Sequence, residues 1–593
     1  MIFDFVSSTR RLMRMPKARP ENVNARAYTA NYVNSKASHT ANYVNFQAIY
    51  TANNVYFKLT YTAKNVNFAI YFDYRKREIA NRQEKQLETR RTMLTRKAYQ
   101  KLIDWKQKSK GTTALLIEGA RRVGKSALVK EFGTNEYQSC LVVDFTYAPD
   151  DVISYFNDMR NDLNSFFLYL SAYYQVPLFE RNTLIVFDEV QAFPKAREFI
   201  KQLVADGRYD YIETGSLVSI RKNVEDIQLP SEEHPMRLNP FDFEEFLWAM
   251  DEAPLSSALA SSFINLKPLP ASLHRKAMRL FREYMLVGGM PQAVQKYVQT
   301  RNFEAVDEIK RDILTLYRND ISKYAGTAVR RVTSIFDNIA GQLSKHEKRF
   351  NLASLGKNVR MRDSEDAFFW LSDAHITNNC FNSTDPSIGL KISEDQTTVK
   401  CYMADTGLLV THALATSETT PESIYRDILL EKIGINEGML TENIIAQQLR
   451  AHGHELFFFS SSNSKNVASS NSKDVIVGNS SGKDVASNNS SGKDVASNNS
   501  NGKDVTSSNS NGKNATGKME IDFLIVAGYA DAAMRARISP IEVKSTKRYS
   551  TASLDKFKTT YGKHVGTQYL LCPKELHVDG DLVTLPLYLA CYL

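Results

Sequence analysis

The stretch with the most evident chemistry is GARRVGKS at residues 119–126. It fits the pattern G-x-x-x-x-G-K-[ST], follows the apolar run ALLIE and precedes a segment typical of a helix, the context in which this pattern binds phosphate. Gly119 and Gly124 let the backbone curl, so that its N–H groups face phosphate oxygens. Lys125 would then reach the β- and γ-phosphates, and Ser126 would bind Mg²⁺. The predicted nucleotide-binding residues are Gly119, Ala120, Arg121, Arg122, Val123, Gly124, Lys125 and Ser126.

A second apolar run, LIVFDE at 184–189, ends in two carboxylates. Asp188 would hold Mg²⁺, mostly through water, and Glu189 would polarise the water that attacks the γ-phosphate. Thr214 or Ser216, at the end of YDYIETGS, could contact the γ-phosphate or that water, although a plain turn explains them as well. The spacing does not choose among three candidates for an arginine finger, which are Arg318, Arg330 and Arg331.

The C-terminal part holds another group of candidate residues. MEIDFLI at 519–525 and PIEVK at 540–544 both read as strands, and period-two geometry places Glu542 and Lys544 on one face. Asp522 and Glu542 could bind one or two Mg²⁺ ions, and Lys544 could orient or activate a water that attacks a phosphodiester. Glu442, in the helical pattern TENIIAQQL, could add a carboxylate ligand. The alternative is an ordinary strand on which Glu and Lys alternate with apolar residues.

Strands and helices alternate around the first motif. Residues 113–118, 140–145 and 182–187 read as strands, and 96–108 and 126–132 as helices, which predicts an α/β fold with a parallel sheet. Residues 329–376 contain three helical patterns, which favour a trihelical or winged-helix unit, or else a helical lid with a basic face. In MADTGLL at 403–409, the Asp and Gly should shape the start of a helix.

A series of segments now identifies a resemblance: GARRVGKS, LIVFDEVQAFP, DGRYDYIETGSL, LNPFDFEEFL, YMLVGGMPQAV and MADTGLL. In this order they resemble the prokaryotic AAA-type ATP-binding proteins that carry a C-terminal domain of unknown function. The resemblance covers about residues 93–593 without the Ser/Asn-rich insertion. It implies ATP and Mg²⁺ as cofactors, a P-loop ATPase domain at 93–240, a helical lid and winged-helix-like region at 241–376, and a C-terminal domain at 377–593. That last domain would have a restriction-endonuclease-like core with a PD-(D/E)xK constellation.

Two repetitive segments lie outside the resemblance. Residues 28–68 repeat a Tyr-Thr-Ala-Asn pattern with period 11, and we expect residues 1–92 to be a disordered extension. It could be an arm for nucleic acid or self-association, or a tandem repeat translated upstream of a start at Met93. Residues 460–518 repeat with period 10, are rich in Ser, Asn and Gly, and should form a flexible insertion.

Charge and composition narrow the function classes. The net charge is +9, but residues 1–92 hold 16 Lys and Arg against 6 Asp and Glu, whereas the rest hold 59 against 60. The basic excess therefore gives no case for nucleic acid binding by the remaining chain. The five cysteines have no metal-finger spacing, and no apolar run reaches the ~18 residues of a membrane span, so we expect a reduced cytoplasmic protein.

Two functions remain open. One is an ATPase coupled to a nuclease-like domain, with ATP, DNA and self-association through the ATPase domain as partners and no membrane. The alternative is a nucleotide-operated switch whose C-terminal domain binds a partner or DNA without cutting. A helicase- or transposition-like motor is a third class, for which the sequence offers no strand-separating motif.

Overall fold

The structure is a computed structural model that describes residues 27–33, 43–50, 55–63, 66–73, 94–216, 227–345, 349–355, 360, 364–415, 418–430, 432, 437–461, 519–527, 537–547 and 549–593. The chain divides into two compact units, Met1–Leu94 and Thr95–Leu593. The predicted flexibility of the Ser/Asn-rich insertion concerns residues that lie, from 462 to 518, outside the described ones.

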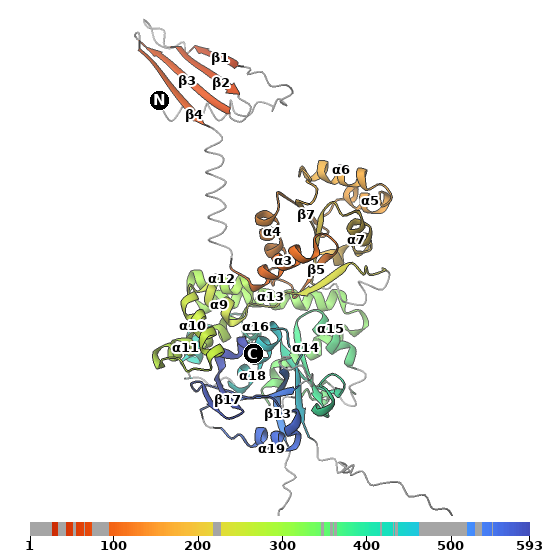
Figure 1. Ribbon diagram of the computed structural model, residues 1–593, viewed down its shortest axis with the longest axis vertical. Coiled ribbons are helices and arrows are strands. Elements are labelled where there is room, and N and C mark those ends of the chain that lie inside the picture. The colour runs from red at the N-terminus through yellow and green to blue at the C-terminus, as the bar shows by residue number, and fades with distance from the viewer. Residues whose placement is uncertain are drawn as a thin grey trace, which may run out of the picture. The chain divides into compact units, whose positions relative to one another are not determined.

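The first unit contains an antiparallel sheet in the order β1-β2-β3-β4 (Figure 1). Its strands are β1 (Ala27–Val33), β2 (Tyr43–Tyr50), β3 (Val55–Ala63) and β4 (Val66–Asp73). We expected disorder here because the repeat is poor in Leu and Ile; the described parts are strands, and the rest of residues 1–92 lies outside the described residues. Thr, Tyr and Val, which recur in every repeat, are residues that favour strands, and this preference accounts for the difference.

The second unit begins with a parallel sheet in the order β6-β7-β8-β5-β9. The parallel α/β fold predicted from the sequence is therefore confirmed. The strands are β5 (Ala114–Glu118), β6 (Ser139–Asp144), β7 (Thr183–Asp188), β8 (Asp210–Gly215) and β9 (Glu233–Arg237). The helices among them are α3 (Lys97–Ser109), α4 (Lys125–Glu136), α5 (Asp150–Asp158), α6 (Leu163–Tyr174) and α7 (Lys195–Asp206).

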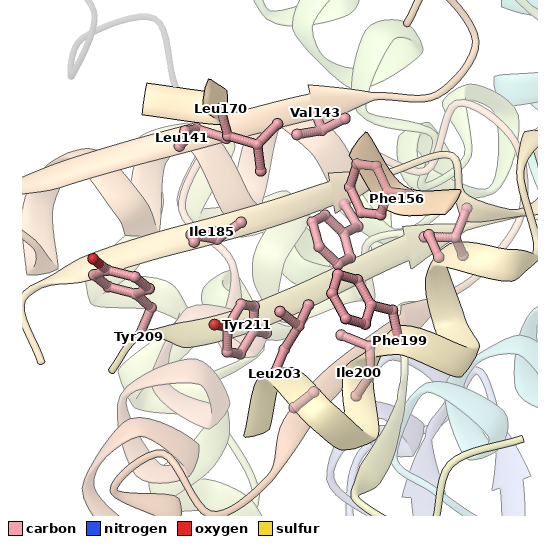
Figure 2. Packing of buried hydrophobic residues seen from close by; sticks show 14 of the residues in the cluster. Leu141, Val143, Phe156, Leu170, Ile185, Phe199, Ile200, Leu203, Tyr209 and Tyr211 are labelled. Atoms are coloured by element: carbon pink, nitrogen blue, oxygen red, sulfur yellow. The ribbon is translucent and has the colours of Figure 1, made fainter. Parts of the chain in front are cut away.

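One face of this sheet packs against α5, α6 and α7 through a buried aromatic cluster (Figure 2). Phe156 from α5 makes edge-on ring contacts with Phe166 of α6, Phe187 of β7 and Phe199 of α7. Edge-to-face aromatic pairs and the burial of these large rings stabilise the layer. Asp188, the last residue of β7, lies at the edge of the parallel sheet where β5 also ends.

A helical region follows the sheet. Its helices are α9 (Phe243–Ala249), α10 (Ala253–Asn265), α11 (Ala271–Val287), α12 (Pro291–Thr300), α13 (Phe303–Tyr324), α14 (Val329–Leu343) and α15 (Glu365–Asp373). Helix α9 starts at a complete capping box, in which Asp242 accepts from the Glu245 backbone and Glu245 accepts from the Asp242 backbone. Of the three helical patterns predicted in 329–376, two are α14 and α15, and Leu352–Leu355 forms a 3₁₀ turn. A winged helix stays a prediction.

The remaining strands form an eight-stranded mixed sheet, β11-β10-β12-β13-β14-β15-β17-β16. Their bounds are β10 (Thr377–Ser383), β11 (Glu394–Met403), β12 (Phe457–Ser460), β13 (Glu520–Ala527), β14 (Arg537–Val543), β15 (Gln568–Cys572), β16 (His577–Asp579) and β17 (Leu582–Pro586). The helices of this part are α16 (Thr406–Ala413), α17 (Glu422–Leu429), α18 (Glu437–Ala451) and α19 (Ala552–Tyr561). The boundaries expected at 240 and 376 stay predictions, since 95–593 is one compact unit.

Helix α16 begins as the sequence predicted, because the Asp405 side chain accepts a hydrogen bond from the Leu408 backbone at 2.9 Å. Asp405 Oδ2 also accepts from the Gly289 backbone at 2.5 Å. This hydrogen bond joins the segment 403–409 to the segment YMLVGGMPQAV, which contains Gly289. In the described part of the chain, none of the helices combines the length and the apolar character that crossing a bilayer needs.

Candidate nucleotide site and C-terminal acidic cluster

The loop between β5 and α4 has the backbone geometry that its glycines predict. Gly124 lies in the left-handed region with φ of 97°, and Arg122 shares that region with φ of 68°. A β-carbon on Gly119 would lie 2.4 Å from the Leu238 carbonyl oxygen, so only glycine fits there. Because α4 starts directly after Gly124, its first N–H groups and its dipole face the concave side of the loop.

Three polar side chains meet at the carboxyl ends of β7 and β8. Ser126 Oγ donates to Asp188 Oδ1 at 2.8 Å, and the Thr214 hydroxyl donates to the same oxygen. Ser216, two residues further along, is also buried. A serine hydroxyl beside a carboxylate at a phosphate-binding loop is a donor set that fits Mg²⁺, which is bound through a few protein oxygens, waters and phosphates.

Lys125 lies inside the loop and is buried. Its ammonium donates to the Gly119 carbonyl at 2.8 Å and to the Ala120 carbonyl at 3.2 Å. Burial lowers the pKa of Lys125 to about 8, although the carboxylates of Glu189 and Asp188 act to raise it. A phosphate group placed in the loop would add negative charge beside this ammonium and so favour its protonated form.

Glu189 follows β7 and also has a left-handed backbone, with φ of 56°. Its N–H donates to Thr214 Oγ1 at 3.4 Å, and its carboxylate accepts from the Gln191 side chain. A non-glycine residue in this region carries strain, and such residues cluster at functional sites. The chain turns at Glu189, so the two neighbouring acids have different partners: Asp188 accepts from Ser126 and Thr214, whereas Glu189 accepts from Gln191.

Two arginines connect the loop to other elements, and sequence reasoning identified neither contact. Arg96 donates to the carbonyls of Val123 at 3.2 Å and Asn239 at 2.6 Å, and its guanidinium pairs with Glu245 at 3.1 Å. Arg121, within the loop, pairs with Asp320 of α13 at 2.6 Å. The sequence carried no signal for these partners.

The three candidate arginine fingers lie on α13 and α14 with exposed side chains. Arg318 pairs with Asp337 at 2.8 Å, and both side chains are more than two-fifths exposed. Arg330 and Arg331 are exposed on α14. A pocket of about 420 Å³ lies beside the loop, between α12 and α13, with Arg122, Gln292, Lys296 and Asp312 among its lining residues.

The C-terminal candidates come together on β13 and β14. The antiparallel register pairs Phe523 with Ile541, which sets Asp522 opposite Glu542, and Asp522 Oδ2 accepts from the Val543 backbone at 2.8 Å. Glu542 Oε1 pairs with Lys544 at 2.6 Å. Burial raises the pKa of Glu542, and Asp522 adds to this rise, whereas Lys544 opposes it.

A lysine that sequence reasoning missed lies beside these acids. Lys400 of β11 is 1% exposed, and its ammonium lies 3.2 Å from Glu520 and 3.8 Å from Asp522. Two residues along the same strand, the Tyr402 hydroxyl donates to Glu442 at 3.1 Å. Lys400 stands in the alternating run TTVKCYM, where nothing in the sequence marks it as the partner of acids on β13.

The acidic cluster is incomplete as a three-ligand metal site. Among the described residues, no three His, Cys, Asp or Glu side chains stand together at a spacing that could hold a metal ion. The predicted ligands Glu442, Asp522 and Glu542 nevertheless share one neighbourhood, since all three act on the pKa of Lys544 and help to raise it. Binding of a metal ion by Asp522, Glu542 and Glu442 therefore stays a prediction.

Comparisons with known proteins agree with the first site. Residues 111–247 match a family described as AAA domain, and residues 278–419 match a domain of unknown function (DUF8612). The AAA match supports an AAA-type P-loop domain in the segment that contains the loop, Asp188 and Glu189. No curated protein matches the chain.

Two solved structures align with the chain at low similarity. One is a signal transduction ATPase (STAND) protein with a tetratricopeptide repeat sensor from Pyrococcus horikoshii, at 10% identity over 60% of this chain and 48% of that chain, with a TM-score of 0.22. The chain thus spans about half of that relative's length. The other is the Drosophila ORC bound to DNA, at 13% identity over 51% and 90%, with a TM-score of 0.17. At these TM-scores, neither alignment supports an argument.

Proposed function

We propose that this chain is an AAA-type ATPase that binds and hydrolyses ATP with Mg²⁺ at the loop formed by residues 119–126. The observation that carries the proposal is the meeting of Ser126, Asp188 and Thr214 at the end of the parallel sheet, within the segment that matches the AAA domain. These side chains come from three separate elements, and a chance motif would not assemble them at one edge.

Each residue then has a role set by its position. The backbone N–H groups of the loop and the start of α4 bind the phosphates, and the Lys125 ammonium neutralises their charge. Ser126 and Asp188 would hold Mg²⁺, which screens the charge of the phosphate oxygens when it is bound. Glu189 accepts a proton from, or orients, the attacking water, and Thr214 fixes the Asp188 carboxylate.

ATP turnover tests this proposal. Phosphate release should be measured for the full chain and for Lys125→Ala and Glu189→Gln. We expect Lys125→Ala to weaken nucleotide binding and Glu189→Gln to keep binding while it loses hydrolysis. Equal phosphate release by all three proteins would contradict the ATPase assignment.

A second candidate function concerns the C-terminal domain. We propose that it has a restriction-endonuclease-like core in which Asp522, Glu542 and Lys544 form a PD-(D/E)xK-like site that cleaves a phosphodiester of nucleic acid. Glu542 Oε2 favours this, because it is buried and has no hydrogen-bond partner within the described part of the chain. Two carboxylates directly opposite each other on neighbouring strands repel, and a divalent cation between them would offset the repulsion.

Labelled DNA and RNA, incubated with Mg²⁺ or Mn²⁺, separate this candidate from its alternative. Cleavage by the wild type and not by an Asp522→Asn/Glu542→Gln variant would support the nuclease. No cleavage by the wild type, together with a change in DNA or partner affinity on ATP addition, would instead support a nucleotide-operated switch. Lys547→Gln, outside the strand-borne group, is a suitable control variant.

A further inference from the structure

Two polar side chains of helix α13 contact Arg121 of the phosphate-binding loop. The Asp320 carboxylate pairs with the Arg121 guanidinium at 2.6 Å, and the Tyr317 hydroxyl lies 3.5 Å from the Arg121 carbonyl. Tyr317 and Asp320 are three residues apart, so they lie on one face of the helix. This face joins the segment that matches DUF8612 to the segment that matches the AAA domain.

The side chains of Arg121 and Asp320 differ in their exposure to solvent. The Asp320 side chain is 7% exposed, whereas that of Arg121 is 44% exposed. Arg121 can therefore turn to another anion, whereas the Asp320 carboxylate can leave its buried position only if α13 moves. A buried carboxylate that loses an ion-pair partner pays a desolvation penalty that the pair had offset.

Asp320 also belongs to the charge environment of the nucleotide site. Burial raises the pKa of Asp320, and the negative charge of Glu189 raises it further, while Arg121 opposes both. Asp320 in turn acts on Lys125 inside the loop. The carboxylate thus faces the region into which ATP would bring several negative charges, and like charges at this range repel.

We infer that Asp320 is an autoinhibitory counter-ion: it occupies Arg121 while the loop lacks ATP, and the terminal phosphates of ATP must take Arg121 from it. This inference rests on the proposed function, because it requires ATP to bind at the loop. Once Arg121 pairs with phosphate, the unpaired and repelled Asp320 drives α13 away from the loop. Binding of ATP is thereby transmitted to the helical region.

Nucleotide affinity of Asp320→Asn tests the inference. Binding of ATPγS and ADP with Mg²⁺ should be measured by calorimetry on the full chain. We expect the Kd of the variant for ATPγS to fall about fivefold to fiftyfold, because Arg121 is then free to pair with the phosphates, and the Kd for ADP to fall less. An unchanged or higher Kd for ATPγS would overturn the inference.

Two further variants serve as controls. Asp337→Asn breaks the exposed pair with Arg318, which is also on α13, and should leave the Kd unchanged. In an Arg121→Gln background, Asp320→Asn should lose most of its effect, because Asp320 acts through Arg121. An undiminished effect in that background would contradict the displacement.

A measurement on the wild type avoids the question of whether the variants fold. Deuterium uptake by peptides from α13 should increase when ATPγS binds, because the helix loses its contact with the loop. Deuterium uptake that falls or stays the same while ATPγS binds would overturn the inference about Asp320 and leave the proposed ATPase function intact. Failure of the wild type to bind any nucleotide would overturn the proposed function, and the inference with it.

Discussion

Ser126 and Asp188 are 62 residues apart in the sequence, and the Ser126 hydroxyl donates to the Asp188 carboxylate at 2.8 Å. We expect Ser126→Ala to lower Mg²⁺-dependent ATP turnover about 10- to 100-fold, because one oxygen of the proposed magnesium site is lost. Turnover as a function of Mg²⁺ concentration is the measurement. Ser257→Ala, at an exposed serine of α10, is the control, and a variant as active as the wild type at every Mg²⁺ concentration would contradict the assignment.

The depressed pKa of Lys125 predicts how ATP binding depends on pH. In the free protein this pKa is about 8, and bound phosphates would raise it, so the complex holds the proton more tightly. Affinity is therefore greatest below pH 8 and falls about tenfold per unit as the pH rises above that value. ATP titrations between pH 7 and about 9.5 measure this fall. Lys125→Arg keeps its charge throughout, and a fall of the same size in that variant would show that another group is responsible.

Gly407 marks a close approach of two backbones. A β-carbon there would lie 2.4 Å from the Val287 carbonyl oxygen and 2.6 Å from the Gly288 α-carbon. We expect Gly407→Ala to lower the free energy of unfolding by about 1–3 kcal/mol, because rigid backbone must shift to admit the methyl group. Urea denaturation followed by circular dichroism measures it. Gly341→Ala, in α14 with nothing within 4 Å, should instead be neutral or stabilise by up to ~1 kcal/mol.

Lys400 is a buried cation that neutralises part of a partly exposed acidic cluster. We expect Lys400→Met to lower the free energy of unfolding by about 3–5 kcal/mol, since Glu520 and Asp522 would lose their buried cation. Added Mg²⁺ should recover part of this loss by supplying the missing positive charge. The control is Lys432→Met, whose lysine is 64% exposed and pairs with Asp427, itself 39% exposed, and this change should cost at most ~1 kcal/mol. Equal melting temperatures for the two variants would contradict a special role of Lys400.

Structural features that depend on residues close together in the sequence could be predicted from it. The parallel sheet followed from alternating apolar and helical segments, and the start of α16 followed from Asp405 and its neighbours. The register that sets Asp522 opposite Glu542 could not be predicted, because it depends on how two strands pair rather than on either alone. In the described parts of the N-terminal repeat, the strand preference of Tyr, Thr and Val is reflected in the strands β1–β4, whereas the low content of Leu and Ile favours disorder.

The sequence by itself determined the phosphate-binding loop and the two acids at the end of β7, because their chemistry depends on residue types at fixed short spacings. Only the tertiary structure decided which charges face them. Arg121 meets Asp320 across 199 positions of sequence, and Lys400 of β11 meets acids on β13. Such pairs depend on how helix faces pack and on the order of strands in a sheet. Neither can be predicted from a local sequence pattern.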